Sequence, residues 1–348
     1  MDVDIYMDID TRLNNCYFIK TMLLLFVVLG HCMDFWNGNW FTVYKPIDSS
    51  ITIPFISGWL NSFHIYGFII VSGYIYAFKK NDDYRNYKSF IIKKIKRLIF
   101  PYFFVAIVWV IPLSQLFFRW PIIEIFKKYV LAINPSQLWF LWMLFWVFLI
   151  IYPLDRFLIS HPYYGYVLLF LFHIIGRILG KTVPDYFCFL TSLKYILVFY
   201  IGVRMWRNEK LYLILSKIPG VVLLMLDLLA YYVVDYFKGN EFYIGKIVSR
   251  GSDLFLGLFG GVIAFVVLQK IAFSISWWRC KTILLLKDFS FHIYLFHQQI
   301  IYFVIKMMNG LYSPVLIVII SFCVSSSISI GIAILLNKNQ FVKKYVGL

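Results

Sequence analysis

The chain has 348 residues, of which 61% are hydrophobic, 21% are aromatic and only 14% are charged. A soluble globular domain carries about 25% charged residues, so the composition excludes that class and predicts an all-α, polytopic membrane protein. The net charge of +16 is explained by Lys and Arg in cytoplasmic loops. Because no aromatic–basic RNA-binding motif is present, we expect no nucleic-acid partner.

The cysteines predict neither disulfides nor a metal site. All five are scattered and none forms a C-x-x-C pair: Cys16, Cys32, Cys188, Cys280 and Cys323. Four aspartates lie among the first ten residues, which is the wrong charge for a signal peptide. We therefore expect the first helix to stay in the mature protein.

Ten apolar stretches are predicted to be transmembrane helices, since a helix needs about 20 apolar residues to cross a bilayer. Their approximate limits are 18–33, 55–78, 98–118, 138–154, 163–180, 189–206, 219–235, 252–269, 288–306 and 315–336. No repeat or low-complexity linker divides them. We expect one integral-membrane domain over residues 1–348, with a core at about 14–336.

Lys and Arg are unevenly distributed over the connecting segments. With a cytoplasmic N-terminus, the inside segments hold 22 of the 33 basic residues and the outside segments hold 10. Because cytoplasmic loops collect Lys and Arg, this excess predicts that both termini lie in the cytoplasm.

The first predicted span carries a cation near its start and an imidazole near its end. Lys20 and His31 are eleven residues apart, so in an α-helix they project from the same face, roughly 16 Å apart along the axis. The predicted orientation places Lys20 at the inner surface and His31 toward the outer one. Polar groups inside a span are costly and indicate function. The alternatives are a Lys20 that only reaches the membrane surface and a purely structural His31.

The second predicted span has His64 near its middle and Ser72-Gly73 eight residues later. Ser and Gly in a membrane helix commonly permit close helix packing. A buried His64 could be held by a neighbouring carbonyl or hydroxyl. A role in substrate binding is the alternative for both positions.

Residues 79–97, KKNDDYRNYKSFIIKKIKR, form the strongest charged segment. The segment could act only as a determinant of topology. Its end crowds Lys93, Lys94, Lys96 and Arg97 into about one helical turn. Clustered cations at a membrane surface suit phosphates or anionic lipid head groups.

Later spans carry weaker signals. Leu138–Trp142 is typical of a membrane boundary, where Trp is enriched, and Phe199–Gly202 suits helix packing. His292 and His297 are five residues apart, which does not match the i, i+4 spacing of a two-histidine metal site. His297 could line a substrate site or be a hydrogen-bonded core histidine.

Taken in order, these motifs resemble the acyltransferase 3 family of integral-membrane O-acyltransferases, which modify bacterial cell-surface glycans. In its first span, that family has Arg or Lys, then ten residues, then His, and this His ends an apolar stretch like VVLGH. Lys20 and His31 match this pattern. The Lys version looks most like the branch of fucose O-acetylase-like and intercellular-adhesion-type proteins. Phe68–Tyr74 matches the F-x-x-x-SG-Y element, and Lys94 and Arg97 match a basic pair before Pro-Tyr.

The resemblance implies transfer of an acyl group, by default acetyl, from cytosolic acyl-CoA to a hydroxyl of a capsular polysaccharide, exopolysaccharide or lipid-linked sugar. It implies His31 as the general base, or as the carrier of a transient acyl group. Acetyl-CoA is then a substrate, and no tightly bound cofactor is expected. The protein is expected in the plasma membrane of a bacterium, in contact with its lipids and without the extra periplasmic domain of some relatives. The residues expected to bind acyl-CoA or substrate are Lys20, Lys94, Arg97, Ser72, Tyr74, His64 and His297.

Two other classes of membrane protein stay open from the residues alone. A glycan exporter or flippase would be equally helical, basic and aromatic, but it predicts several paired charges within the spans. Arg177, Lys194 and Asp227 are the obvious candidates for such charges. A lipid-linked glycan polymerase usually has a large outer loop, whereas the longest outer loop expected here covers residues 34–54.

Overall fold

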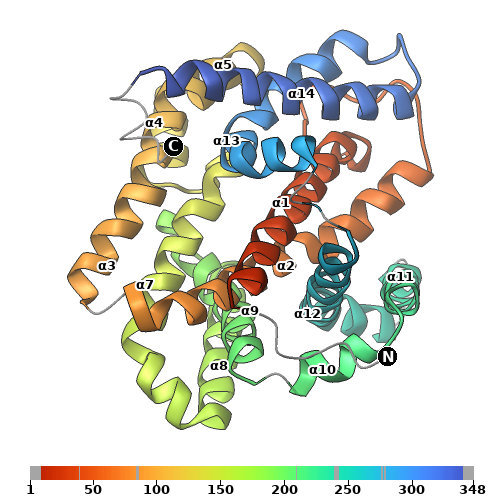
Figure 1. Ribbon diagram of the computed structural model, residues 1–348. Helices are drawn as coiled ribbons and strands as arrows, with labels where there is room; N and C mark the ends of the chain where they lie inside the picture. The colour runs from red at the N-terminus through yellow and green to blue at the C-terminus, as the bar shows by residue number, and fades with distance from the viewer. Residues whose placement is uncertain are drawn as a thin grey trace. The chain divides into compact units, whose positions relative to one another are not determined.

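The computed structural model describes residues 9–38, 40–83, 86–208, 210–238, 243–275, 277 and 280–339. Within these ranges the chain forms α-helices with short 3-10 and π turns, and no β-strand (Figure 1). In this part of the chain, 9 helical segments are long and apolar enough to cross a membrane. The prediction of an all-α, polytopic membrane protein is confirmed.

Each of the ten predicted spans falls on helix. The long helices are α1 (Ile9–Met33), α2 (Thr52–Asp83), α7 (Trp139–Ser160), α8 (Pro162–Leu179), α9 (Phe189–Arg207), α11 (Gly220–Lys238), α12 (Tyr243–Ser274), α13 (Lys281–Met308) and α14 (Pro314–Asn337), joined by shorter pieces that include α6 (Ile122–Ile125) and α10 (Lys210–Lys217). The ninth predicted span lies on α13, which is not among the nine apolar segments. Its buried histidines and glutamines lower its hydropathy.

The third predicted span is a composite helix. It consists of α3 (Tyr87–Lys94), η2 (Ile95–Ile99), α4 (Phe100–Val105), η3 (Ala106–Val110) and α5 (Ile111–Phe118). Pro101 and Pro112 lie at the starts of α4 and α5, directly after the π turns η2 and η3. Because Pro lacks an N–H and crowds the preceding turn, a wider π turn allows the helix to continue. The helix starts at Tyr87, so the basic residues expected before the span lie within it.

The described chain groups into two compact units. Unit 1 contains the chain up to Trp40, Ser49–Phe78 and Tyr200–Ser290. Unit 2 contains Phe41–Asp48, Lys79–Phe199 and the chain from Phe291 onward. The organisation as one integral domain stays a prediction.

Close helix contacts in unit 1 depend on glycine. A Cβ added at Gly202 of α9 would lie 2.0 Å from the carbonyl oxygen of Ile70 in α2. A Cβ added at Gly261 of α12 would lie 2.9 Å from the backbone nitrogen of Gly67 in α2. Small residues thus let α2 pack directly against two neighbouring backbones, which is the packing role that the sequence suggested for Gly202.

Helices α1 and α11 each pack against α12 in unit 1 (Figure 1). The buried side of α11 carries Leu223, Asp227 and Tyr231 at four-residue spacing, so they share one helical face. The carboxylate of Asp227 accepts a hydrogen bond of 2.8 Å from the indole nitrogen of Trp59. A Cβ added at Gly260 would lie 2.6 Å from the other carboxylate oxygen. This carboxylate is therefore enclosed by α2, α11 and α12.

In unit 2, α7 packs against α3 and α8. At the contact with α3, the ring of Phe90 stacks on Tyr152 with 4.7 Å between centroids. Helix α8 also meets α9, where the ring nitrogen Nδ1 of His173 donates to the carbonyl oxygen of Lys194 at 2.7 Å. His173 is thus held by a helix contact.

Candidate functional site

The end of α1 and the 3-10 turn η1 (Asp34–Asn37) hold a polar pair in unit 1. Nδ1 of His31 lies 3.1 Å from Oδ2 of Asp34. An ionised carboxylate only accepts hydrogen bonds, so Nδ1 carries the proton and Nε2 is the basic nitrogen. Sequence reasoning missed Asp34, although its position three residues after His31 places both on one helical face.

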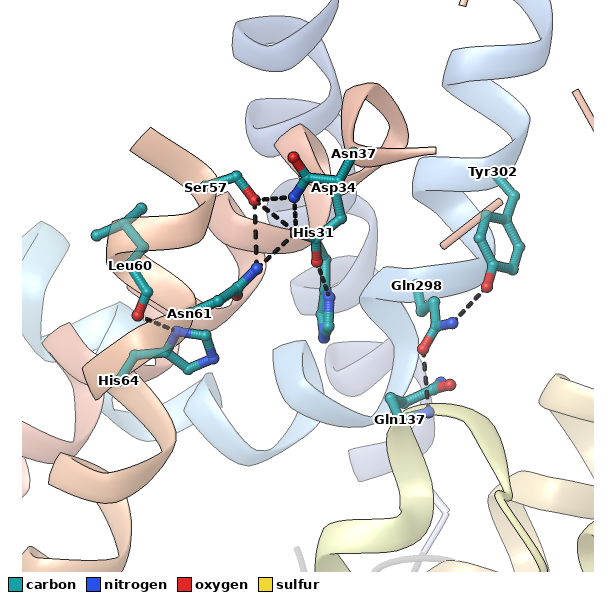
Figure 2. A network of polar contacts seen from close by, with 10 residues as sticks. All are labelled: His31, Asp34, Asn37, Ser57, Leu60, Asn61, His64, Gln137, Gln298 and Tyr302. Atoms are coloured by element: carbon teal, nitrogen blue, oxygen red, sulfur yellow. Dashed lines mark hydrogen bonds and ion pairs between the residues drawn. The ribbon is translucent and has the colours of Figure 1, made fainter. Parts of the chain in front are cut away.

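The second oxygen of Asp34, Oδ1, accepts three hydrogen bonds (Figure 2). Two donors come from α2: the hydroxyl of Ser57 at 2.5 Å and the amide of Asn61 at 2.6 Å. The third is the amide of Asn37, at 3.3 Å. Asp34 is 8% exposed. These hydrogen bonds offset the cost of burying its charge and stabilise the ionised form.

An indole ring covers one face of the His31 imidazole. The rings of His31 and Trp40 are stacked, with 5.3 Å between centroids and 13° between planes. Counting side-chain atoms alone, His31 is 23% exposed and Asp34 is 11% exposed. The imidazole is thus reachable from outside the cluster, while its carboxylate partner is shielded.

Gly30 leaves room for the Asn61 side chain of α2 at this end of α1. A Cβ added there would lie 2.9 Å from Oδ1 of Asn61 and 3.8 Å from the His64 ring. His64 is 1% exposed, and its Nδ1 donates to the carbonyl of Leu60 at 2.6 Å (Figure 2). The structure thus brings His64, which was expected to bind substrate, beside the His31 cluster, and it satisfies Nδ1 within α2.

Lys20 lies on α1 with His31, as the sequence predicted, about three turns earlier in the helix. Its ammonium group is 4.9 Å from the centroid of the Phe68 ring in α2, which is cation–π geometry. The contact places the cation against α2, next to the motif that begins at Phe68. Its expected contact with acyl-CoA stays a prediction.

Ser72 and Tyr74 are buried in helix contacts of unit 1. The hydroxyl of Ser72 donates to the carbonyl of Phe68 at 2.8 Å. The ring of Tyr74 meets Trp206 and Phe265, each with 5.2 Å between centroids. These contacts agree with the packing interpretation of the SG-Y element. Substrate binding by the two residues stays a prediction.

The basic pair before Pro101 belongs to unit 2, and its two members have different surroundings. Lys94 is 9% exposed, and its ammonium group lies 3.6 Å from the ring centroid of Phe148 and 5.0 Å from that of Phe90. Arg97 is exposed. Of the two expected phosphate ligands, Arg97 is therefore the more accessible in unit 2.

A second polar cluster in unit 2 lies on α13 and the 3-10 turn η5 (Ser136–Leu138). Gln137 donates its backbone N–H to Gln298 at 3.0 Å, and Gln298 donates to the hydroxyl of Tyr302 (Figure 2). The side-chain amide of Gln137 also donates to Gln299 at 2.9 Å. His297 is fully buried beside them, and its Nδ1 lies 2.9 and 2.8 Å from two carbonyl oxygens of the preceding turn. These contacts fit the core-histidine alternative. A role of His297 at the substrate stays a prediction.

The described residues contain no cluster of three or more His, Cys, Asp or Glu side chains able to hold a metal ion. What unit 1 offers is an oriented, partly exposed base: an imidazole whose Nδ1 is fixed by a buried carboxylate. Such an imidazole can remove a proton from a hydroxyl or attack an acyl carbon.

Comparison with known proteins identifies the family. A family model described as an acyltransferase domain, that of the acyltransferase 3 family, matches residues 16–337. No curated protein and no solved structure was found to match. The matched range contains both Lys20 and His31, so the predicted family is confirmed, whereas the finer branch stays a prediction. The chain belongs to the acyltransferase 3 family, and it is a multi-pass membrane acyltransferase.

Proposed function

We propose that this acyltransferase moves an acyl group, by default acetyl, from cytosolic acyl-CoA to a hydroxyl of a cell-surface, capsular or lipid-linked sugar, with His31 as the general base. The bacterial plasma membrane is the proposed location. The observation that carries the proposal is the 3.1 Å contact between His31 Nδ1 and Asp34. It leaves Nε2 as the basic nitrogen on the residue that matches the family motif.

In the proposed step, His31 carries one proton from the acceptor hydroxyl to the departing thiolate. The acceptor hydroxyl gives its proton to Nε2 of His31 while its oxygen bonds to the thioester carbonyl carbon. The carbon–sulfur bond then breaks, and the departing thiolate takes the proton from the imidazolium, giving the ester and free CoA thiol. General-base catalysis of this kind contributes roughly 10²- to 10⁴-fold in rate. Attack by Nε2 itself, through an acyl-histidine, is the competing version.

The donor side of the proposal relies on cations. Lys20 lies on the same helix as His31, about 16 Å earlier along its axis, and we assign it to a CoA phosphate. Arg97, exposed in unit 2, is a second candidate for phosphate. The residues still proposed to contact donor or acceptor are Lys94, Ser72, Tyr74, His64 and His297.

The test uses membranes that contain the protein and their own glycans, supplied with radiolabelled acetyl-CoA. We expect label in the glycan, release of CoA thiol and a glycan mass increase of about 42 Da per modified hydroxyl, the mass of acetyl replacing hydrogen. His31→Ala should lower the rate by at least about 100-fold. Transfer by His31→Ala at the wild-type rate, with equal protein abundance, would show that His31 is not the base. Glycan movement without thiol release would favour an exporter.

A further inference from the structure

We propose that Asp34, Ser57, Asn61 and Trp40 form a cradle that stabilises the protonated form of His31 during the transfer step. The inference rests on the proposed function and deepens it. It assigns four positioning residues that act through His31. We call this group the imidazolium cradle.

The charge of the cluster is complementary to the imidazolium that forms during the transfer step. Within the described chain, the partners of Asp34 are His31 and three neutral groups, from Asn37, Ser57 and Asn61. With a neutral imidazole the cluster therefore carries one net negative charge, and with an imidazolium it carries none. An opposite charge is worth most in a buried, low-dielectric site. The cradle is thus complementary to the state in which His31 holds the proton of the acceptor.

The hydrogen bonds run in one direction, toward Asp34. Ser57 has a single O–H, which donates to Asp34 at 2.5 Å. The oxygen of Ser57 accepts from the amides of Asn37 at 2.9 Å and Asn61 at 3.2 Å. Each donor thus has an assigned acceptor, and the carboxylate is fixed before the reaction begins. Such preorganised dipoles and charges need no rearrangement as charge develops on the imidazole.

Helix α2 supplies two members of the cradle from one face. Ser57 and Asn61 are four residues apart, so they lie one above the other on the helix surface. Both reach the same oxygen of Asp34. The position of Asp34, and through it the direction of Nε2, is therefore set by the spacing of α1 and α2.

Trp40 contributes through its ring face. The centroid distance of 5.3 Å is within the range of about 6 Å for attraction between a cation and an aromatic face. A neutral imidazole gains stacking alone, whereas an imidazolium gains the cation–π term as well. Trp40 therefore stabilises the reacting state more than the resting state, which is the condition for raising kcat.

The experiment measures initial rates in membrane vesicles that retain their own glycans, with radiolabelled acetyl-CoA at limiting and saturating concentration. We expect Asp34→Asn to lower kcat by at least about 100-fold and Asn61→Ala or Ser57→Ala by roughly 10-fold, the loss of one hydrogen bond to a charged group. Trp40→Ala should lower kcat roughly 2- to 30-fold, and Trp40→Phe should restore most of it. The KM for acetyl-CoA should stay unchanged in all of these variants.

A double variant separates the cradle from ordinary structural support. If Asn61 acts through Asp34, adding Asn61→Ala to Asp34→Asn should cost little more than Asp34→Asn alone. If the double variant instead loses the product of the two single-variant factors in kcat, the cradle is wrong. A fall in thermal stability that parallels each loss of kcat would also overturn it. Asp288→Asn, at a carboxylate with 62% exposure, is the matched control and should behave as wild type.

The activity of His31→Ala distinguishes a failure of the proposed function from a failure of the cradle. An active His31→Ala, or a wild-type protein that transfers no label, would defeat the proposed function itself. Suppose that His31→Ala is inactive while Asp34→Asn and Trp40→Ala keep the wild-type kcat. That result would support the function and contradict the cradle. If Asp34→Asn does not fold, the comparison of Trp40→Ala with Trp40→Phe decides.

Discussion

Replacing Gly202 by alanine would force α2 and α9 apart. The added Cβ would lie 2.0 Å from the carbonyl oxygen of Ile70, 2.8 Å from its carbonyl carbon and 3.0 Å from its Cα. Ordinary contact starts at 3.4 Å, so the backbones must separate by about 1.4 Å, the difference between 3.4 and 2.0 Å. The obstacle is backbone, which cannot turn aside as a side chain can. Overpacking of this kind costs roughly 1–3 kcal/mol.

The displacement should also reach the His31 cluster. Ile70 and Asn61 lie on the same helix, α2, nine residues or roughly 13 Å apart. A rigid shift of α2 would move Asn61 and Ser57 relative to Asp34. A misplacement of about 1 Å at a reacting centre can lower the rate about 100-fold. Gly202→Ala should therefore reduce both stability and acyl transfer.

The assay is thermal unfolding of the detergent-solubilised protein, together with transfer from radiolabelled acetyl-CoA in membranes. Gly331→Ala is the matched control, because a Cβ at Gly331 in α14 meets no described atom within 4 Å. That change should leave activity intact and stabilise the protein by roughly 0.5–1 kcal/mol, the usual gain for Gly→Ala in a helix. The packing argument is wrong if Gly202→Ala unfolds at the wild-type temperature and transfers acetyl at the wild-type rate.

Three further predictions use the same two assays. Asp227→Ala leaves the Trp59 indole without its acceptor and should cost roughly 1–3 kcal/mol, whereas Asp227→Asn keeps an acceptor; equal unfolding temperatures for the two variants would contradict this. Lys20→Ala should raise the KM for acetyl-CoA more than Lys20→Arg, and equal effects would argue against a role for its charge. Lys94→Ala should lower stability because that cation is packed on Phe148. Arg97→Ala, at an exposed position, should instead raise the KM for acetyl-CoA at unchanged stability. If Lys94→Ala raised the KM and Arg97→Ala lowered stability, the phosphate-binding role would pass to Lys94 and the structural role to Arg97.

The features that the sequence predicted correctly are those that depend on local patterns along the chain. Ten apolar runs fall on helices, and the spacing of Lys20 and His31 was enough to place both on one helix and to suggest the family. Phe199–Gly202 was predicted as a helix-packing site, because small residues let membrane helices approach closely.

The parts that could not be predicted depend on contacts between segments far apart in the chain. Asp34 lies just beyond the predicted end of the first span, where a carboxylate is typical of a loop. Ser57 and Asn61 gain their role only because their side chains reach Asp34 from α2, more than twenty residues later in the chain. The burial of Lys94 depends on Phe148 in α7, more than fifty residues later. The early start of the third helix, at Tyr87, was hidden by charges that lower its hydropathy.

The π turns of the third helix have a consequence for its lipid-facing surface. Each π turn accommodates one residue more than an α turn, so the extra residue is absorbed within a single turn. Deleting one residue from η3 should therefore convert it to a regular α turn and leave the same faces of α5 buried and exposed. Deleting one residue from the first turn of α5 itself would instead shift the residues that follow by about 100°. Phe117, which is 7% exposed, would then take the place of Leu116, which is 60% exposed. The two π turns thus let the helix hold an extra residue beside each proline without changing which faces of the flanking segments are buried.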